Sequence, residues 1–245
     1  MNRTLEIPGD GPWFEGHFPG RPILPGVAAL ALVVDALGGA PLRRIAHARF
    51  RRVIGPGERL SLDTREGADG ATRVVLARAG EPVLQAELVF GPPAPATPAT
   101  LAAGAPLETP PLDLLLPHRA PMRWVDAVFA ERDDGTDCAA RIPSACALVR
   151  GGTAPAFAAL EACAQAAAMW EALRRNRDAG AASARVGYVV GFRDVTLHRA
   201  AIAADAAFTT RVRLEAAALP LTHYRAEAAD GDGTLLSGMI ATALA

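Results

Sequence analysis

The chain has 245 residues, is 51% hydrophobic and 21% charged, and carries a formal net charge of −1. This is the balance of an ordinary globular protein of one or two domains, and it gives no reason to expect a nucleic-acid partner. All 25 residues of the Lys and Arg class are arginines, which excludes Schiff-base lysine chemistry and the lysine-dependent phosphate loop of P-loop enzymes.

The first part of the chain predicts one helix followed by an antiparallel meander. A short strand at Arg3–Ile7 precedes a proline-rich loop, and an apolar run then predicts a helix from Gly26 to Leu37. Strand-like runs follow at residues 43–53, 59–66, 71–79 and 83–90. A sheet wrapped around a buried helix requires this order of elements.

The same pattern restarts after a linker. Residues 92–111 are rich in Pro, Ala and Thr and predict a semi-rigid connection. The apolar run Ala154–Trp170 then predicts a second central helix with Glu161 as its single charge, and strands are expected at residues 123–129, 136–142, 187–198, 208–215, 222–228 and 235–244. We therefore expect an N-terminal domain at 1–91 and a C-terminal domain at 112–245, around the linker at 92–111.

The loop before the first helix has the strongest chemical signature, Phe14–Val27, FEGHFPGRPILPGV. Its three prolines at intervals of three stiffen the backbone, and Gly26 stands where the loop must become a helix. Histidine titrates near neutrality, and a helix N-terminus offers free N–H groups to a developing oxyanion. A rigid loop that holds His17 against a helix N-terminus is therefore a good place for acid–base chemistry.

GHFPGRPILPGV closely resembles the signature of the hotdog-fold β-hydroxyacyl-(acyl carrier protein) dehydratases of fatty acid and polyketide-like synthesis. Three further segments resemble that family: Ala48–Gly57, Leu114–Asp126 (LLLPHRAPMRWVD) and Glu161–Gln165 (EACAQ). The resemblance implies an α+β fold, a double hotdog in which two antiparallel sheets each wrap around a central helix and pack as a pseudo-dimer.

The resemblance also implies roles for particular residues. In the family, the histidine is the catalytic base, a glycine nine residues on offers its N–H to the thioester carbonyl, and an acid fourteen residues after the histidine completes the site. His17 and Gly26 match this pattern, but the fourteenth position is Ala31. In the second half Glu161 matches the acid, and Ala147 stands where the histidine should be.

Family members place their active site at a dimer interface, with histidine and acid from different subunits. Carried over to this chain, His17 and Glu161 would form one composite site, and Ala31 and Ala147 a dead one. A carboxyl group alone among apolar residues should have a raised pKa and could then donate a proton. The same resemblance places four further residues around the oxyanion and substrate: Phe18, Pro25, Val27 and Gln165.

Other interpretations of these residues stay open. Glu161 could instead be a structural partner of Arg193 or Arg199, because buried carboxylates are rarely unpaired. Asp35 could be a substitute acid in the first half, and Gln165 a satisfied core amide. The remaining histidines and the cysteines, which are expected to be free thiols, are interpreted as structural: His118, His47, His198, His223, Cys138, Cys146 and Cys163.

Arg49, Arg51 and Arg52 could form a solvated strand face, or could bind an acidic carrier protein or the phosphate of its phosphopantetheine. No HExxH motif, cysteine pair or glycine-rich phosphate loop is present, so we expect neither a metal nor an organic cofactor. The first residues carry no apolar signal segment, and no apolar run reaches membrane-spanning length. A cytoplasmic protein without a membrane partner is expected.

The predicted function is dehydration of 3-hydroxyacyl-(acyl carrier protein) thioesters to trans-2-enoyl thioesters at the composite site. The pairing of a histidine-bearing half with a degenerate half is similar to the paired dehydratase subunits of aryl-polyene biosynthesis, here in one chain. Two alternatives are a hotdog acyl thioesterase and a non-catalytic carrier-binding or scaffold protein with a decayed site. The acyl group, the pathway, further homo-oligomerisation and the choice between carrier protein and coenzyme A are left open.

Overall fold

The computed structural model describes residues 2–67, 69–99, 104–179, 184–218 and 220–244. In the first half the elements are β1 (Asn2–Glu6), α1 (Gly26–Ala36), β2 (Leu42–Phe50), β3 (Arg59–Glu66), β4 (Thr72–Arg78) and β5 (Glu81–Phe90). In the second half they are α2 (Leu112–Leu115), β6 (Val125–Arg132), β7 (Gly135–Ala140), β8 (Thr153–Pro155), the 3₁₀ turn η1 (Ala156–Ala158), α3 (Ala159–Ala179), β9 (Gly187–Leu197), β10 (Ala201–Ala203), β11 (Phe208–Ala218), β12 (Leu221–Asp230) and β13 (Gly233–Leu244).

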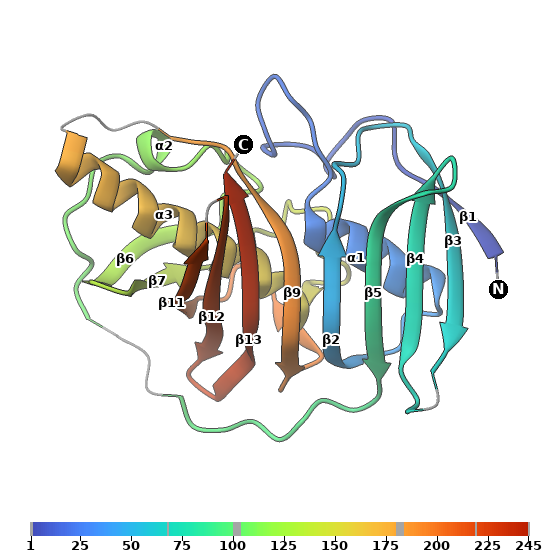
Figure 1. Ribbon diagram of the computed structural model, residues 1–245. Helices are drawn as coiled ribbons and strands as arrows, with labels where there is room; N and C mark the ends of the chain where they lie inside the picture. Colours follow the sequence, from blue (N-terminus) through green and yellow to red (C-terminus); the bar gives the residue numbers. More distant parts are fainter. Residues whose placement is uncertain (1, 68, 100–103, 180–183, 219, 245) are drawn as a thin grey trace.

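Eleven of the described strands form one sheet in the order β1-β3-β4-β5-β2-β9-β13-β12-β11-β7-β6. All of its neighbouring strands pair antiparallel, and β8 and β10 form a separate two-stranded sheet. Figure 1 shows α1 behind the strands of the first half and α3 behind those of the second. This arrangement is the predicted double hotdog, which is confirmed.

The two halves join where β2 pairs with β9. Ile45 lies opposite Val195 and Ala48 opposite Phe192, and all four side chains are buried. The rings of Phe50 and Phe192 meet edge to face, with centroids 5.2 Å apart. The joint therefore combines ladder hydrogen bonds with apolar packing, which makes the sheet continuous across the pseudo-dimer.

The central helices are buried because they are apolar on nearly every side. In α1 the side chains of Val27, Leu30 and Val33 are completely buried, and the positive φ of Gly38 and Gly39 turns the chain away at its end. In α3 the first turns are buried, whereas Arg174 in its last part is exposed. Both helices thus present their N-terminal ends inside the molecule.

The sequence placed several boundaries differently. The second helix was expected from Ala154, but Pro155 is extended and ends β8, so α3 begins at Ala159 after the 3₁₀ turn. Its polar end was predicted at Glu171–Arg177 and continues to Ala179. The short elements α2, β8 and β10 were not predicted, because segments of three or four residues carry no measurable period.

The predicted linker is anchored along the sheet where it is described. The amide of Ala94 donates to the Leu197 carbonyl at 2.9 Å, and the amide of Thr234 donates to the Thr97 carbonyl at 3.0 Å. Residues 100–103 of the predicted linker lie outside the described residues. The domain boundaries at 91 and 112 stay a prediction. Within the described residues, no helix combines the length and the hydropathy that crossing a membrane requires.

Candidate active site

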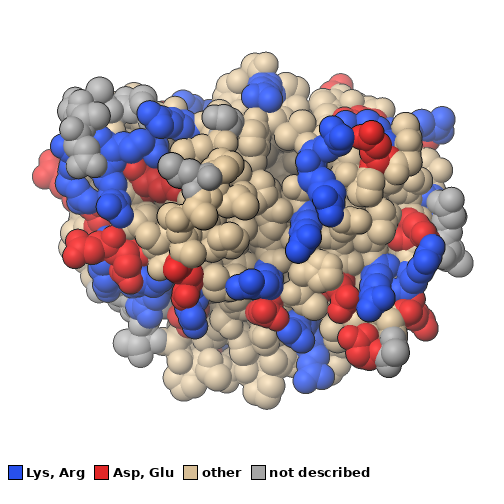
Figure 2. Space-filling model, viewed as in Figure 1, with Lys and Arg blue, Asp and Glu red and all other residues tan. Residues whose placement is uncertain are grey.

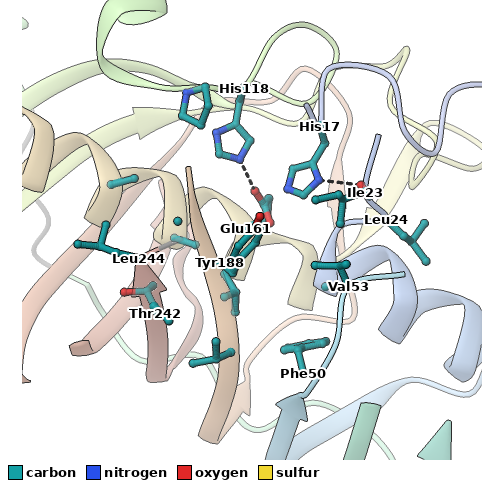
Figure 3. Close-up of a pocket in the computed structure, with 18 of the residues that line it drawn as sticks. His17, Ile23, Leu24, Phe50, Val53, His118, Glu161, Tyr188, Thr242 and Leu244 are labelled. Carbon is teal, nitrogen blue, oxygen red and sulfur yellow. Dashed lines mark hydrogen bonds and ion pairs between the residues drawn. The ribbon is translucent and has the colours of Figure 1, made fainter. Parts of the chain in front are cut away.

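His17 and Glu161 come from the two halves of the chain and line the same cavity. The cavity has a volume of about 200 Å³ and opens between the loop before α1, the N-terminal part of α3 and the ends of β9 and β13 (Figure 3). A ring nitrogen of His17 and a carboxylate oxygen of Glu161 lie within 4.8 Å of each other. The double hotdog therefore brings together the two residues that the composite-site hypothesis pairs.

The orientation of His17 is set by its own loop. Its Nδ1 lies 2.8 Å from the carbonyl oxygen of Ile23, and its ring stacks on Phe18 with centroids 4.0 Å apart. A carbonyl can only accept, so Nδ1 carries the hydrogen and Nε2 keeps its lone pair. Burial lowers the pKa of His17 most strongly, the Glu161 carboxylate raises it, His118 lowers it again, and the pKa falls to about 4. The imidazole is therefore neutral near pH 7 and able to accept a proton at Nε2.

One oxygen of Glu161 is held by two donors. Oε1 lies 3.2 Å from Nε2 of His118 and accepts from Nε2 of Gln165 at 3.1 Å. Gln165 is fixed in turn, because it donates to the carbonyl of Met122 at 2.7 Å and accepts from the amide of Trp124 at 2.8 Å. Among the described residues none bonds to Oε2, which is the oxygen left for a substrate.

The predicted rise in the pKa of Glu161 is wrong. Burial does raise it, but the hydrogen bond from His118, the charges of His118 and His17 and the hydrogen bond from Gln165 outweigh burial and lower the pKa to about 2. The sequence showed only the apolar neighbours of Glu161 on its own helix. His118 approaches from a different loop, so its contribution was not visible.

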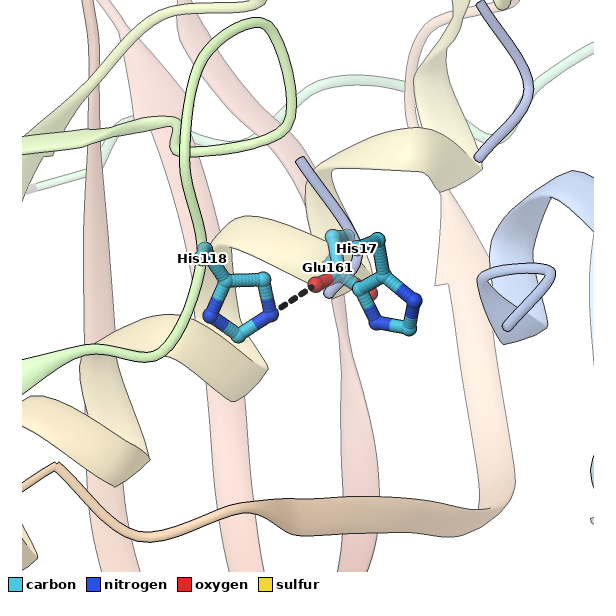
Figure 4. A group of neighbouring side chains, drawn as sticks. All are labelled: His17, His118 and Glu161. Carbon is cyan, nitrogen blue, oxygen red and sulfur yellow. Dashed lines mark ion pairs between the residues drawn. The ribbon is translucent and has the colours of Figure 1, made fainter. Parts of the chain in front are cut away.

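His118 is the site residue that sequence reasoning left without a role. Its ring lies beside Glu161, opposite His17 (Figure 4), with ring centroids 5.3 Å from His17 and 4.9 Å from Phe18. The predicted alternative partners of Glu161 lie elsewhere: Arg193 pairs with Asp194 and Arg199 with Asp230 and Asp232. The LPHR segment was a usable signal, since a histidine that the family motif carries is a candidate partner for a buried carboxylate.

Gly26 lines the cavity as the first residue of α1. The N–H groups of a first helical turn have no intrahelical acceptor, so this amide is available to a ligand. A Cβ at this position would lie 3.1 Å from the ring of Phe50, which explains a residue without a side chain. Four other predicted substrate contacts are not among the residues that line this cavity, and their roles stay predictions: Phe18, Pro25, Val27 and Gln165.

The motifs in the two halves match two family models. The model described as ApeP-like, ApeP dehydratase, matches residues 110–244, and the model described as ApeI-like, ApeI dehydratase, matches residues 1–79. This chain belongs to the ApeP-like dehydratase family. The predicted resemblance to hotdog dehydratases is confirmed, and the two halves of this ApeP-like chain match different models.

The matches to curated relatives cover shorter parts of the chain than the ApeP-like model does. The 3-hydroxyacyl-[acyl-carrier-protein] dehydratase FabZ of Aeromonas hydrophila is 37% identical over 97 residues, covering 32% of this chain and 63% of the relative. The FabZ of Thermus thermophilus is 38% identical over 65 residues, covering 21% of this chain and 46% of the relative. The chain thus spans less than two thirds of the length of these relatives.

Solved structures share the fold. A monomeric dehydratase domain from a trans-AT polyketide synthase split module has a TM-score of 0.70 at 13% identity, covering 100% of this chain and 99% of that one. The dehydratase heterocomplex ApeI:P from Xenorhabdus doucetiae has a TM-score of 0.51 at 21% identity, covering 56% of this chain and 93% of that one. At these identities the likeness supports the double hotdog and not a particular chemistry.

Asp35 is not placed as a substitute acid in the ApeP-like chain. It pairs with Arg150 at 2.6 Å and lines a second cavity of about 280 Å³ together with Ala31. His17 does not line that cavity.

The three arginines of the predicted carrier contact are exposed on or just after β2. Arg51 and Arg52 line the cavity, with Arg51 bonded to Gln85 at 2.7 Å and Arg52 paired with Glu81 at 2.6 Å. Figure 2 shows a row of basic side chains over the upper ends of β2 and β5. Both interpretations of Arg49, Arg51 and Arg52 are therefore compatible with their positions.

The ligand atoms of His17, His118 and Glu161 all lie within 4.8 Å of one another, and two imidazoles with a carboxylate suit zinc or iron(II). In the observed arrangement, Nε2 of His118 bonds to Oε1 of Glu161, so a metal would have to break that bond. The expectation that no metal is needed stays a prediction.

The three cysteines are free and buried, as expected of small core residues. Of the remaining histidines, His47 lies on β2 and His223 on β12, whereas His198 follows β9 and bonds to the carbonyl of Pro95 at 2.6 Å. None of these six residues lines the cavity of His17.

Proposed function

We propose that this ApeP-like protein dehydrates 3-hydroxyacyl thioesters held on an acyl carrier protein and releases trans-2-enoyl thioesters. The observation that carries the proposal is the placement of His17, with Nε2 unprotonated, and Glu161, with Oε2 unbonded, in one cavity. FabZ relatives are named as dehydratases of such carrier-bound substrates. The two halves of one chain would then do the work of two subunits.

His17 would remove the α-proton. Its low pKa keeps Nε2 free to accept at neutral pH, and the bond from Nδ1 to the Ile23 carbonyl steadies the imidazolium that forms. The thioester oxygen, on which negative charge develops, would accept a hydrogen bond from the amide of Gly26, at the positive end of α1. These two contacts account for the first half of the elimination.

Glu161 would give a proton to the leaving hydroxyl through Oε2. Burial is the largest influence on its pKa and acts upward, and an acyl chain in the cavity adds to the desolvation. Because the donors from His118 and Gln165 hold the pKa at about 2 without substrate, this step requires that Oε2 take up a proton when substrate binds. As the C3–O bond breaks, the hydroxyl takes that proton and leaves as water, while His17 holds the α-proton; the two roles reverse in hydration.

The carrier protein would dock at the arginine-bearing rim. Arg51 and Arg52 line the cavity and Arg49 lies exposed on the adjoining strand. Guanidinium groups pair well with the phosphate of phosphopantetheine and with acidic side chains. The substrate would thus bring its own prosthetic arm, and the protein would need no resident cofactor.

The test is turnover of a 3-hydroxyacyl thioester on a carrier protein, followed by the mass loss of one water from the carrier. The proposal expects enoyl-carrier to form with wild type and not with His17→Ala. Release of free carrier thiol instead would identify a thioesterase. Binding of the carrier without any change in its mass would identify a non-catalytic scaffold.

A further inference from the structure

We infer that His118 is a positioning residue of this site: through Nε2 it holds Oε1 of Glu161, so that Oε2 faces His17 and the substrate. This inference rests on the proposed dehydration for its kinetic consequences. It adds a positioning residue to a site for which the sequence indicated two acid–base residues, His17 and Glu161.

The contact between His118 and Glu161 is buried on both sides. The two side chains are 8% and 5% exposed, and their atoms Nε2 and Oε1 lie 3.2 Å apart. Nδ1 of His118 is also buried and has no hydrogen-bond partner among the described residues. A carboxylate oxygen can only accept, so the hydrogen in this contact is on Nε2 of His118. His118 is then a donor to the carboxylate.

The backbone that carries His118 is locked to the loop of His17. The amide of Arg119 donates to the carbonyl of Gly16 at 2.9 Å, and the guanidinium of Arg119 donates to the carbonyl of His118 at 2.8 Å. Three charged or titratable groups contact His118: His17, Glu161 and Arg119. Because this bond joins the two loops that carry the histidines, the position of His118, and of the carboxylate that it contacts, is tied to that of the base.

Two donors on a single oxygen prevent the carboxylate from rotating. Gln165 approaches Oε1 from the helix of Glu161 itself, and His118 approaches from the opposing loop. A reacting group must be held within about 0.5 Å of its productive position, which is what such supporting bonds achieve. Loss of His118 should therefore impair the chemical step more than substrate binding.

The kinetic experiment compares His118→Leu with His118→Gln in the full chain. Leucine removes the donor, and kcat should fall roughly 10- to 100-fold, as for a lost hydrogen bond to a charged group, with KM changed less than about threefold. Glutamine keeps an N–H donor and should recover kcat to within about fivefold of wild type. The matched control is His47→Leu on the exposed side of β2, which should leave kcat unchanged.

A second readout does not depend on turnover. Carbon-13 NMR of labelled glutamate, with the Glu161 signal assigned by its loss in Glu161→Gln, follows the titration of this carboxyl group. Its pKa should rise in His118→Leu, because burial remains and the donor is gone, and should stay low in His118→Gln and His47→Leu.

The two readouts separate the inference from the proposed function. If wild type does not dehydrate the substrate but the Glu161 titration shifts in His118→Leu, the proposed function fails and the contact stands. An unchanged titration or an unchanged kcat in His118→Leu would overturn the positioning role. A third outcome would also overturn it: His118→Gln keeps the Glu161 pKa low but has a kcat as low as that of His118→Leu. His118 would then act by supplying a proton and not by positioning the carboxylate.

Discussion

The amide of Arg119 donates to the carbonyl of Gly16 across 2.9 Å, and this bond ties the loop of one half to the loop of the other directly beside the site. Gly16 has a φ of +78°, and a Cβ built on it would lie 2.0 Å from the carbonyl oxygen of Arg119. No side chain fits between the two loops. Gly16 is therefore required by close approach as well as by its backbone conformation.

Gly16→Ala should lower both stability and turnover. The strain of a left-handed alanine costs about 1 kcal/mol, and separating the loops adds a clash that Gly20→Ala does not have. Gly20 is the matched control, because its φ is +73° and nothing lies within 4 Å of its added Cβ. Urea unfolding of both variants measures the difference. Equal destabilisation, with turnover equally preserved, would contradict a tight contact between the loops.

His17→Ala and Glu161→Gln should each reduce dehydration by roughly a hundredfold or more, as expected for positioned acid–base groups. The double variant should be little worse than either single one, because base and acid act as a unit. Asp35→Asn should have a far smaller effect, since Asp35 pairs with Arg150 and lines the second cavity. The measurement is kcat/KM on the carrier-bound substrate. Full activity of Glu161→Gln beside a dead His17→Ala would refute the composite site.

The sequence predicted the fold well because each half contains one apolar helix and a meander with clear turn signals. Its motifs also singled out His17 and Glu161. It did not predict that His118 joins them, because that contact depends on the approach of Gly16 to Arg119, which is a tertiary distance. The sign of the Glu161 pKa shift was missed for the same reason, since helix neighbours report burial and not the donors that other loops supply.

The pH dependence should follow His17. Its pKa is lowered from 6.5 to about 4, so the folded protein binds fewer protons at this residue than the unfolded chain between those values. The contribution of His17 to the free energy of unfolding is therefore fully present above pH 6.5. It is lost as the pH falls toward 4, by roughly 3 kcal/mol in total. The difference in unfolding free energy between wild type and His17→Asn measures the slope. If this difference did not change between pH 6.5 and pH 4, the lowered pKa of His17 would be contradicted. A fall of kcat/KM on the acid side with a midpoint near pH 6.5 would contradict it as well.

Exhaustive treatment with a chelator should leave turnover unchanged. Elimination beside a thioester carbonyl needs a base, an acid and an oxyanion donor, and His17, Glu161 and Gly26 offer these groups. In addition, Nε2 of His118 is already bonded to Glu161. Turnover before and after chelation, with the metal content measured alongside, is the check. Activity that disappears on chelation and returns with an added metal would show that the three ligand atoms hold an ion.

The second site that the family pattern would form from positions 31 and 147 should stay inactive even when its acid and base are restored. Ala31→Glu and Ala147→His, placed in a His17→Ala background, would supply an acid and a base at the positions that the family pattern assigns. The oxyanion donor is still absent. Ala156 stands nine residues after Ala147, as Gly26 does after His17, but its amide already donates to the carbonyl of Ala200 at 3.0 Å.

A glutamate at position 31 would also stand one helical turn from Asp35, within the surroundings of Arg150, which would compete for it as an ion-pair partner. The corresponding amide of Gly26 in the first site has no such acceptor in its helix. Turnover of the triple variant should therefore remain at the level of His17→Ala alone. Recovery of dehydration in that variant would mean that an oxyanion donor is dispensable, and the role proposed for Gly26 would have to be abandoned.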